Sequence, residues 1–280
     1  MAGAVASWPA DWRTRLRVAG QSLLAPVLAR RAALGARRFH AFAVGLPRSG
    51  THSLAAMFDG RFRAAHEPAL VDTIAHTMSW NRGERSPARM RALLRWRDRR
   101  LGLELEAAHY LHHVAPLLVQ EFPAARFVLT IREPLGWLRS EINQNLRSAD
   151  FAFWRALEAQ RYGRYGFAFD DAERALAAAG CPHPVASYLS YWRDHVQSVL
   201  DAVPTERMLV LRTHELEERI PELADFLGVD AGSVDGSRAR AGVGTDEAVD
   251  LQALVDADYL QAEVARHCGG MVSQWFPEQA

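Results

Sequence analysis

The feature that most constrains the fold is a glycine-bearing turn between an apolar strand and a helix. An apolar run at 39–44 predicts a strand, and the turn Gly45-Leu-Pro-Arg-Ser-Gly50 leads into a helix expected over 51–59. A turn of this kind directs backbone N–H groups and the positive end of the helix dipole at one point. The segment therefore predicts a cradle for an anion.

Short apolar runs alternate with helical stretches along the rest of the chain. The expected strands are 39–44, 62–66, 101–106, 126–131 and 208–211, and the expected helices are 51–59, 88–99, 109–121, 221–227 and 257–267. This alternation is typical of an α/β fold with a central parallel sheet and crossover helices. We interpret residues 1–280 as one domain of that class.

The middle of the chain departs from this alternation. Residues 150–204 have a mostly helical pattern and contain several large aromatic side chains: Trp154, Tyr162, Tyr165, Phe167, Tyr188, Tyr191 and Trp192. We expect a helical lobe or lid within the same domain. Its aromatic residues either line an apolar pocket or form core, and core is the more ordinary role for such residues.

Charge and cysteine content exclude several classes of partner. The 33 basic residues, all arginine, balance 33 acidic ones, so no overall field attracts nucleic acid. The arginine bias is typical of a GC-rich bacterial genome. Cys181 and Cys268 lack metal-ligand spacing, so we expect no metal and two reduced thiols in a cytoplasmic protein. Nothing in the sequence indicates an oligomeric state.

The N-terminal segment, residues 1–38, alternates arginines with apolar residues. We expect an amphipathic helix packed on the domain, with its arginines in water. A transit peptide and a membrane-surface helix are the alternatives, and contact with a membrane is not favoured. No apolar run is long enough to span a bilayer.

The anion cradle differs from the ATP-binding form of such loops. That form places lysine and then serine or threonine after the second glycine, where they hold the terminal phosphates and magnesium. Here Thr51 and His52 occupy those positions, and the cation lies within the loop as Arg48. The loop is therefore expected to bind an anion other than magnesium-bound ATP. The alternative is an ordinary turn that is capped by Ser49 and binds no ligand.

Two segments together resemble a known family. Val44-Gly-Leu-Pro-Arg-Ser-Gly-Thr-His-Ser53 resembles the 5′-phosphosulfate loop, in its arginine form, of sulfotransferases that use 3′-phosphoadenosine-5′-phosphosulfate (PAPS). The segment 122–140 resembles the 3′-phosphate motif of these enzymes, with Arg132 and Ser140 at the matching positions. A third segment, 208–229, is similar to their late strand and helix, but Thr213 and His214 depart from the common pattern.

The resemblance implies a P-loop sulfotransferase fold, PAPS as donor and its product PAP. The acceptor would be a hydroxyl or amine on a small molecule, a saccharide or a peptide. Donor-binding roles are implied for Pro47, Arg48, Ser49, Gly50, Thr51, His52, Ser53, Arg132 and Ser140. Arg48 would neutralise the oxygen that leaves with the nucleotide.

The late loop adds a weaker expectation. Arg238 and Arg240, with Gly242 and Gly244, are a plausible counterpart of the basic loop that contributes to the cofactor in this family. A solvated surface turn is the equally acceptable alternative.

Two residues are candidates for the catalytic base. Glu67 ends the second expected strand and resembles the glutamate of the protein-tyrosine branch of the family, whereas His109 follows the third strand near the histidine of the aryl and steroid branch. Strand alternation directs His66 away from Glu67. His112 and His113 belong to a helix that leaves the strand end. The choice between Glu67 and His109 stays open at this stage.

Two other functional classes compete with this hypothesis. A nucleotide kinase would share the turn, but it needs the lysine and the magnesium-binding hydroxyl that this loop lacks. A non-catalytic nucleotide-binding module of the same fold is the second alternative. The presence of Arg48, Glu67, Arg132 and Ser140 argues against it.

Overall fold

A parallel sheet determines where a ligand site can form in this chain. In the computed structural model, which describes residues 35–148, 152–241 and 249–279, the strand order is β2-β3-β1-β4-β5. The strands are β1 (Ala41–Ala43), β2 (Ala64–His66), β3 (Leu105–Ala107), β4 (Arg126–Ile131) and β5 (Met208–Arg212). Every pairing between neighbours is parallel, so all five carboxyl ends lie at one edge. The expected α/β fold is confirmed, with β1 in the centre of its sheet.

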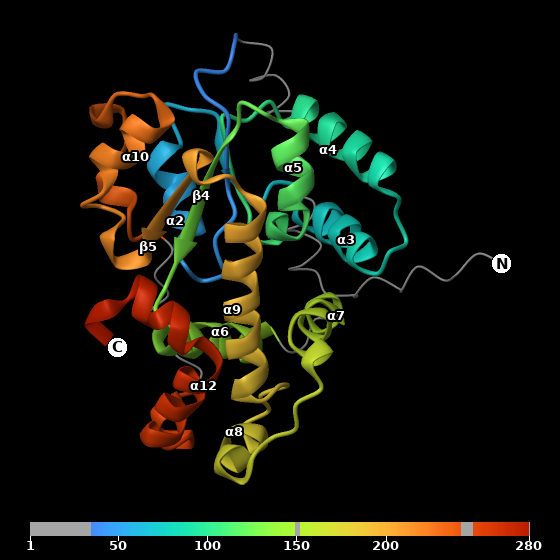
Figure 1. Ribbon diagram of the computed structural model, residues 1–280, viewed down its shortest axis with the longest axis vertical. Helices are drawn as coiled ribbons and strands as arrows, with labels where there is room; N and C mark the ends of the chain where they lie inside the picture. The colour runs from blue at the N-terminus through green and yellow to red at the C-terminus, as the bar shows by residue number, and fades with distance from the viewer. Residues whose placement is uncertain (1–34, 149–151, 242–248, 280) are drawn as a thin grey trace, which may run out of the picture.

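Helices cover both faces of this sheet (Figure 1). They are α2 (Thr51–Phe58), α3 (Leu70–Asn81), α4 (Pro87–Leu101), α5 (Ala115–Glu121), α6 (Pro134–Ser148), α7 (Ala152–Arg161), α8 (Arg174–Ala178), α9 (Val185–Ala202), α10 (Ile220–Leu227), α11 (Leu251–Leu254) and α12 (Ala257–Trp275). Ala43 and Val128 pack in the cluster that contains α2 and α10. Phe42 and Phe127 pack in the cluster that contains α3, α4, α5, α9 and α12. Successive residues of β1 and β4 therefore face opposite layers.

The sequence specifies β4 most completely. Its observed bounds are the expected ones, 126–131, and five of its six residues are buried. A strand that is covered on both faces has a continuous apolar sequence, and this pattern is the clearest signal for a strand. Because β4 pairs with both β1 and β5, it also fixes the edge at which the site lies.

Two local expectations were wrong in detail, and one helix was not expected. The third strand starts at Leu105 rather than at 101, because α4 continues to Leu101 and Gly102, with a left-handed φ of 58°, ends it. The helix expected over 109–121 is a 3₁₀ helix, η1 (His109–Val114), followed by α5. Helix α3, which packs in the same cluster as α4 and α5, was not expected.

The aromatic residues of the middle lobe are mostly core. Tyr188, Tyr191 and Trp192 lie on α9 and are at most 1% exposed. The indole N–H of Trp192 donates to the backbone oxygen of Arg132 at 3.0 Å, which ties α9 to the end of β4. The middle helices therefore belong to the body of the domain. Two of the expected aromatic residues are exceptions: Trp154 of α7 lines the main cavity described below, and Phe167 is exposed.

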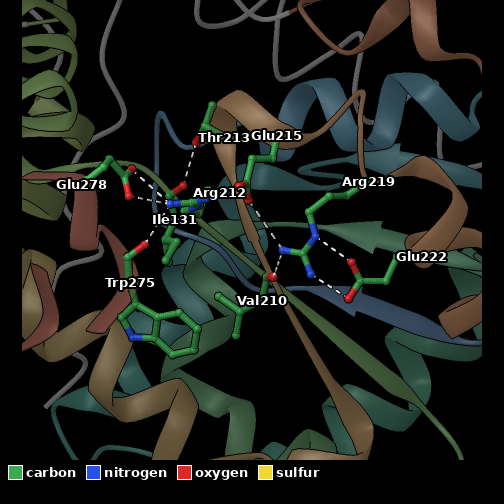
Figure 2. Close-up of polar contacts among 9 residues, drawn as sticks. All are labelled: Ile131, Val210, Arg212, Thr213, Glu215, Arg219, Glu222, Trp275 and Glu278. Carbon is green, nitrogen blue, oxygen red and sulfur yellow. Dashed lines mark hydrogen bonds and ion pairs between the residues drawn. The ribbon is translucent and has the colours of Figure 1, made fainter. Parts of the chain in front are cut away.

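Ion pairs attach the two ends of the described chain to α4 and to the end of β5. Arg37 pairs with Asp98 of α4 at 2.7 Å. Arg212, at the end of β5, pairs with Glu278 at 2.9 Å and also with Glu215 (Figure 2). The segment expected to form an N-terminal amphipathic helix lies outside the described residues except for its last four. Over the described ranges, no helix combines the length and apolar character needed to cross a membrane.

Candidate active site

The turn after β1 has the backbone that an anion cradle requires. Arg48 adopts a left-handed φ of 60°, and Gly50, with φ of 96°, forms the N-cap of α2. No side chain caps that helix, so its first N–H groups point out from the turn. Gly45 is required for a different reason, because a Cβ there would lie 1.9 Å from the hydroxyl of Thr130. The loop thus touches β4 too closely for any side chain at that position.

Hydrogen bonds hold this loop against the sheet. The Ser49 hydroxyl is fully buried and donates toward the backbone oxygens of Leu46 (2.7 Å) and Thr130 (2.8 Å). The Thr213 hydroxyl contacts the backbone oxygens of Ser49 (2.7 Å) and Ile131 (2.9 Å), and the second of these contacts is visible in Figure 2. The loop is therefore preorganised, with Ser49 supporting it from behind rather than facing a ligand through its hydroxyl.

Helix α6 brings the second motif to the first. It runs across the edge toward which the strands point (Figure 1). Its Ser140 hydroxyl accepts a hydrogen bond from Nε of Arg48 at 3.1 Å. The indole of Trp137, on the same helix, donates to the Pro47 oxygen at 2.8 Å. Residues that lie 92 positions apart in the sequence are thus joined at one site.

Positive charge is concentrated there. Within the described residues, the guanidinium of Arg132 makes no hydrogen bond or ion pair, although the residue is half-buried. Burial lowers the pKa of Arg132, and the charges of Arg139 and Arg48 act in the same direction, partly opposed by Glu133. Guanidinium groups that repel one another in this way favour an anion between them.

A cavity of about 760 Å³ collects most of the expected site residues. Its lining includes Pro47, Arg48, Gly50, Thr51, His52, Ser53, Glu67, His109, Arg132, Ser140 and Arg240. Arg238 is absent from this lining because its exposed guanidinium turns to α2, where it donates to the Ala56 oxygen at 3.2 Å. Gly242 and Gly244 lie outside the described residues.

The two candidate bases are partners. Nδ1 of His109 lies 2.6 Å from Oε1 of Glu67, and both residues are at least nine-tenths buried. Nε2 of His109 contacts the guanidinium of Arg161. Burial, followed by the charge of Arg161, lowers the pKa of His109, against the opposing influence of Glu67. Because a neutral imidazole carries one N–H and a guanidinium can only donate, His109 donates from Nδ1 to Glu67 and accepts at Nε2.

The expectation that His66 faces away from Glu67 was wrong. Nε2 of His66 lies 3.8 Å from Oε1 of Glu67 and 3.2 Å from the Thr51 hydroxyl, and the ring lines the cavity. Alternation fails because Glu67 has a left-handed φ of 49° and so no longer belongs to the strand. His112 and His113 do not line this cavity, as expected for a helix that leaves the strand end.

Helices α6 and α7 contribute charged residues to the site that the sequence did not predict. Arg139, Glu141, Glu158 and Arg161 all line the cavity. Glu158 and Arg161 lie one helical turn apart on α7, and that spacing from Trp154 was the signal available in the sequence. Across residues 35–148, 152–241 and 249–279, no cluster of histidine, cysteine, aspartate and glutamate is placed to hold a metal ion.

The sulfotransferase domain family matches this chain over residues 41–236, which is well over half of its length. The chain belongs to the sulfotransferase family. The matched range of this family member contains Arg48, Glu67, His109, Arg132 and Ser140, together with all five strands of the sheet.

Individual relatives of this sulfotransferase-family chain are distant. The Ava biosynthesis cluster protein M of Aspergillus versicolor is 28% identical over 115 residues, which are 39% of this chain and 44% of that protein. The chain thus matches less than half of the length of that relative.

Two solved structures are similar over most of the chain. A sulfotransferase from Alicyclobacillus acidocaldarius has a TM-score of 0.48 and 16% identity, covering 85% of this chain and 96% of its own. A sulfotransferase from Mycobacterium avium has a TM-score of 0.46 and 15% identity, covering 92% and 82%.

Proposed function

We propose that this protein transfers a sulfuryl group from PAPS to a hydroxyl group of an acceptor, without a metal ion. The observation that carries the proposal is the hydrogen bond between Arg48 and Ser140. It joins the segment that resembles a 5′-phosphosulfate loop to the segment that resembles a 3′-phosphate motif. A nucleotide with phosphate groups at both ends needs that combination.

The residues present fit such a nucleotide. The uncapped start of α2, with the hydroxyl of Thr51, would hold the 5′-phosphate. Arg132 and Ser140 would hold the 3′-phosphate, since the Arg132 guanidinium has no partner among the described residues. The tight approach of Gly45 to Thr130 keeps this loop backbone close to the sheet and open to the ligand.

The transfer itself exchanges one sulfur–oxygen bond for another. PAPS supplies the sulfuryl group, and PAP is the leaving group. The acceptor oxygen bonds to sulfur as the sulfur–oxygen bond to the 5′-phosphate breaks, and the proton of the acceptor hydroxyl passes to the carboxylate of Glu67. The guanidinium of Arg48 stabilises the negative charge that develops on the departing oxygen.

Glu67 is a better candidate for the base than His109. The lone pair of His109 Nε2 faces the Arg161 guanidinium, and its Nδ1–H is directed at Oε1 of Glu67. His109 is therefore placed to orient Glu67, and Arg161 to fix the His109 tautomer. In this arrangement Glu67 takes the proton and His109 is a positioning residue.

The compartment we propose is the cytoplasm. Cys181 and Cys268 are both buried and unpaired. Burial raises the pKa of the Cys181 thiol to about 11 and that of the Cys268 thiol to about 12. Such thiols remain protonated and unreactive, as is usual for cysteines of a reducing compartment.

A labelled-donor assay tests the proposed activity. Protein is incubated in EDTA with PAPS labelled in its sulfuryl group and with pooled small molecules, saccharides and peptides. We expect label in at least one pool with wild type, and transfer to that pool at least about a hundredfold slower with Glu67→Gln. Transfer of a labelled terminal phosphate from ATP in magnesium, with no transfer from PAPS, would instead identify a kinase.

A further inference from the structure

The cavity is lined by groups of both charges. Arg48, Arg132 and Arg139 are among its arginines, and the charges of Arg48 and Arg139 act on Arg132. Glu141 of α6 and Glu158 of α7 are among its carboxylates; the charge of Glu141 acts on His109, and Glu158 lies one turn from Arg161, which contacts His109. A cofactor with several phosphate groups accounts for the arginines. It gives no reason for the two carboxylates.

Glu158 is buried without a partner. It is 3% exposed and lines the cavity, yet its side chain makes no hydrogen bond or ion pair within the described part of the chain. It lies on α7 between Trp154, one turn before it, and Arg161, one turn after it, and both of these residues line the same cavity. The cavity face of α7 therefore carries an aromatic ring, a carboxylate and a guanidinium in succession.

Glu141 has half of its carboxylate unsatisfied. Its Oε1 accepts a hydrogen bond from the Tyr162 hydroxyl at 2.6 Å, whereas its Oε2 is buried without a partner, and the residue is 2% exposed. Burial, followed by the charge of Glu141, raises the pKa of Glu158 to about 7, against the opposing charges of Arg161 and Arg155. Two buried carboxylates that repel each other indicate a place where a positive group of a ligand is stabilising.

The two arginines whose charges act on Glu158, Arg161 and Arg155, form no ion pair with Glu158 or Glu141 among the described residues. Arg161 contacts His109 and lies 5.8 Å from the ring centroid of Tyr191. Within the described residues neither carboxylate is therefore neutralised by an ion pair, and both residues line the cavity that also contains Glu67.

We infer that the acceptor is an amino alcohol in the broad sense, a molecule with one hydroxyl and one protonated amine. Its ammonium group donates hydrogen bonds to Glu141 and Glu158, while its hydroxyl lies at Glu67 and receives the sulfuryl group. The inference rests on the proposed function, because it takes Glu67 as the base. It makes Glu141 and Glu158 the residues that determine acceptor specificity.

Two matched sets of probes test the inference directly. One set is tyramine, para-ethylphenol and para-hydroxyphenylpropionate, and the other is aminohexanol, hexanol and hydroxyhexanoate. In each set the hydroxyl is the same and the far end is cationic, neutral or anionic. Their affinities for wild-type protein are measured by calorimetry, both with saturating PAP and without it.

We expect the cationic probe of at least one set to bind about tenfold to a hundredfold more tightly than its neutral counterpart, as charge-assisted hydrogen bonds imply. Glu158→Gln and Glu141→Gln should each remove most of that preference and leave the neutral probes within about twofold of wild type. Glu206→Gln, an exposed residue of η4 (Thr205–Arg207), is the control and should keep the preference.

Three results would overturn the inference. The first is equal affinity for cationic and neutral probes in both sets. The second is a preference that survives both substitutions. The third is a preference for the carboxylate probes, which would mean that Arg161 binds the acceptor and that the acceptors are anionic.

Proton release provides a second readout. Because the pKa of the Glu158 carboxyl is raised to about 7, a bound ammonium group should ionise it and release protons near neutral pH. The heat of tyramine binding should then depend on the ionisation enthalpy of the buffer in wild type and not in Glu158→Gln. An identical buffer dependence in both proteins would contradict the role of Glu158.

The same titrations separate this inference from the proposed function. If PAP fails to bind while the cationic probes keep their preference, PAPS chemistry is wrong and the cation site stands. If PAP binds and the probes show no preference for the cation, the donor assignment stands and the acceptor class is wrong.

Discussion

At the scale of single residues, Glu67 and His109 act together in removing the acceptor proton: Glu67 accepts the proton, and His109 orients Glu67. Glu67→Gln removes the proton acceptor and should lower kcat by about a hundredfold to ten-thousandfold, with PAP affinity within about twofold of wild type. His109→Gln should have a smaller effect on kcat, because it weakens only the orientation of the carboxylate. Steady-state kinetics and PAP calorimetry on both variants measure these effects.

The opposite assignment of these two residues would give the opposite result in turnover. Near wild-type turnover in Glu67→Gln together with an inactive His109→Gln would make His109 the base. Glu206→Gln serves as the matched control for the loss of one carboxylate, since Glu206 is exposed on η4.

Arg132 should provide recognition of the 3′-phosphate. Arg132→Ala is expected to weaken PAP by at least about tenfold while ADP, which lacks that phosphate, changes by less than about threefold. Ser140→Ala should act in the same direction on a smaller scale. Calorimetry with both nucleotides measures the ratio, and Arg61→Ala, an exposed arginine, is the control. Parallel loss of PAP and ADP would mean that Arg132 supports the fold instead.

At the scale of elements, the loop after β1 depends on its close contact with β4. Gly45→Ala should destabilise the protein by about 1 to 3 kcal/mol and weaken PAP, because its Cβ would overlap the Thr130 hydroxyl. Gly269→Ala is the matched control: nothing lies near its Cβ on α12, so the change should be neutral or stabilising by up to about 1 kcal/mol. Urea unfolding measures both, and a Gly45→Ala protein as stable as Gly269→Ala would contradict this account.

The elements also show how far sequence reasoning reaches. Strand β4 was predicted to the residue because burial on both faces leaves a pure apolar run. The loop after β1 was found because its glycines are needed for local backbone geometry. Helix α3 was missed. The cavity face of α7 was also missed, because the contacts of Glu158 and Arg161 with the site exist only after the chain has folded. The helical spacing of Trp154, Glu158 and Arg161 is visible in the sequence, but it does not say that this face of the helix lines the site.

At the scale of the whole molecule, buried histidines couple stability to pH. Burial is the first cause that lowers the pKa of four histidines at or near the sheet, namely His109, His112, His113 and His195. Burial lowers the pKa of His195 to about 3. The Nε2–H of this neutral ring donates a hydrogen bond to the Val44 oxygen at 2.8 Å. A histidine that stays neutral in the folded state stabilises it fully above the unfolded pKa of about 6.5.

That stability should be lost as pH falls from about 6.5 toward the folded pKa, by up to about 1.4 kcal/mol per pH unit for each imidazole. Glu158 acts in the opposite direction between about 4.5 and 7, and Glu173, whose pKa is also raised by burial, acts the same way, but these are two carboxyl groups against four imidazoles. Urea unfolding at about pH 5 should therefore give a free energy at least about 2 kcal/mol below that at about pH 7. His195→Gln should reduce this slope and the exposed His214→Gln should not, whereas a slope unaffected by His195→Gln would contradict the assignment.

The central claim is that one arginine-rich site binds a nucleotide phosphorylated at both ends, without metal. The most direct test is calorimetry of PAP, ADP and ATP with the wild-type protein in EDTA, followed by ATP in magnesium. The account predicts that PAP binds in EDTA at least about tenfold more tightly than ADP, and that magnesium gives ATP no advantage. Loss of PAP binding in EDTA, or tight ATP binding that requires magnesium, would contradict it.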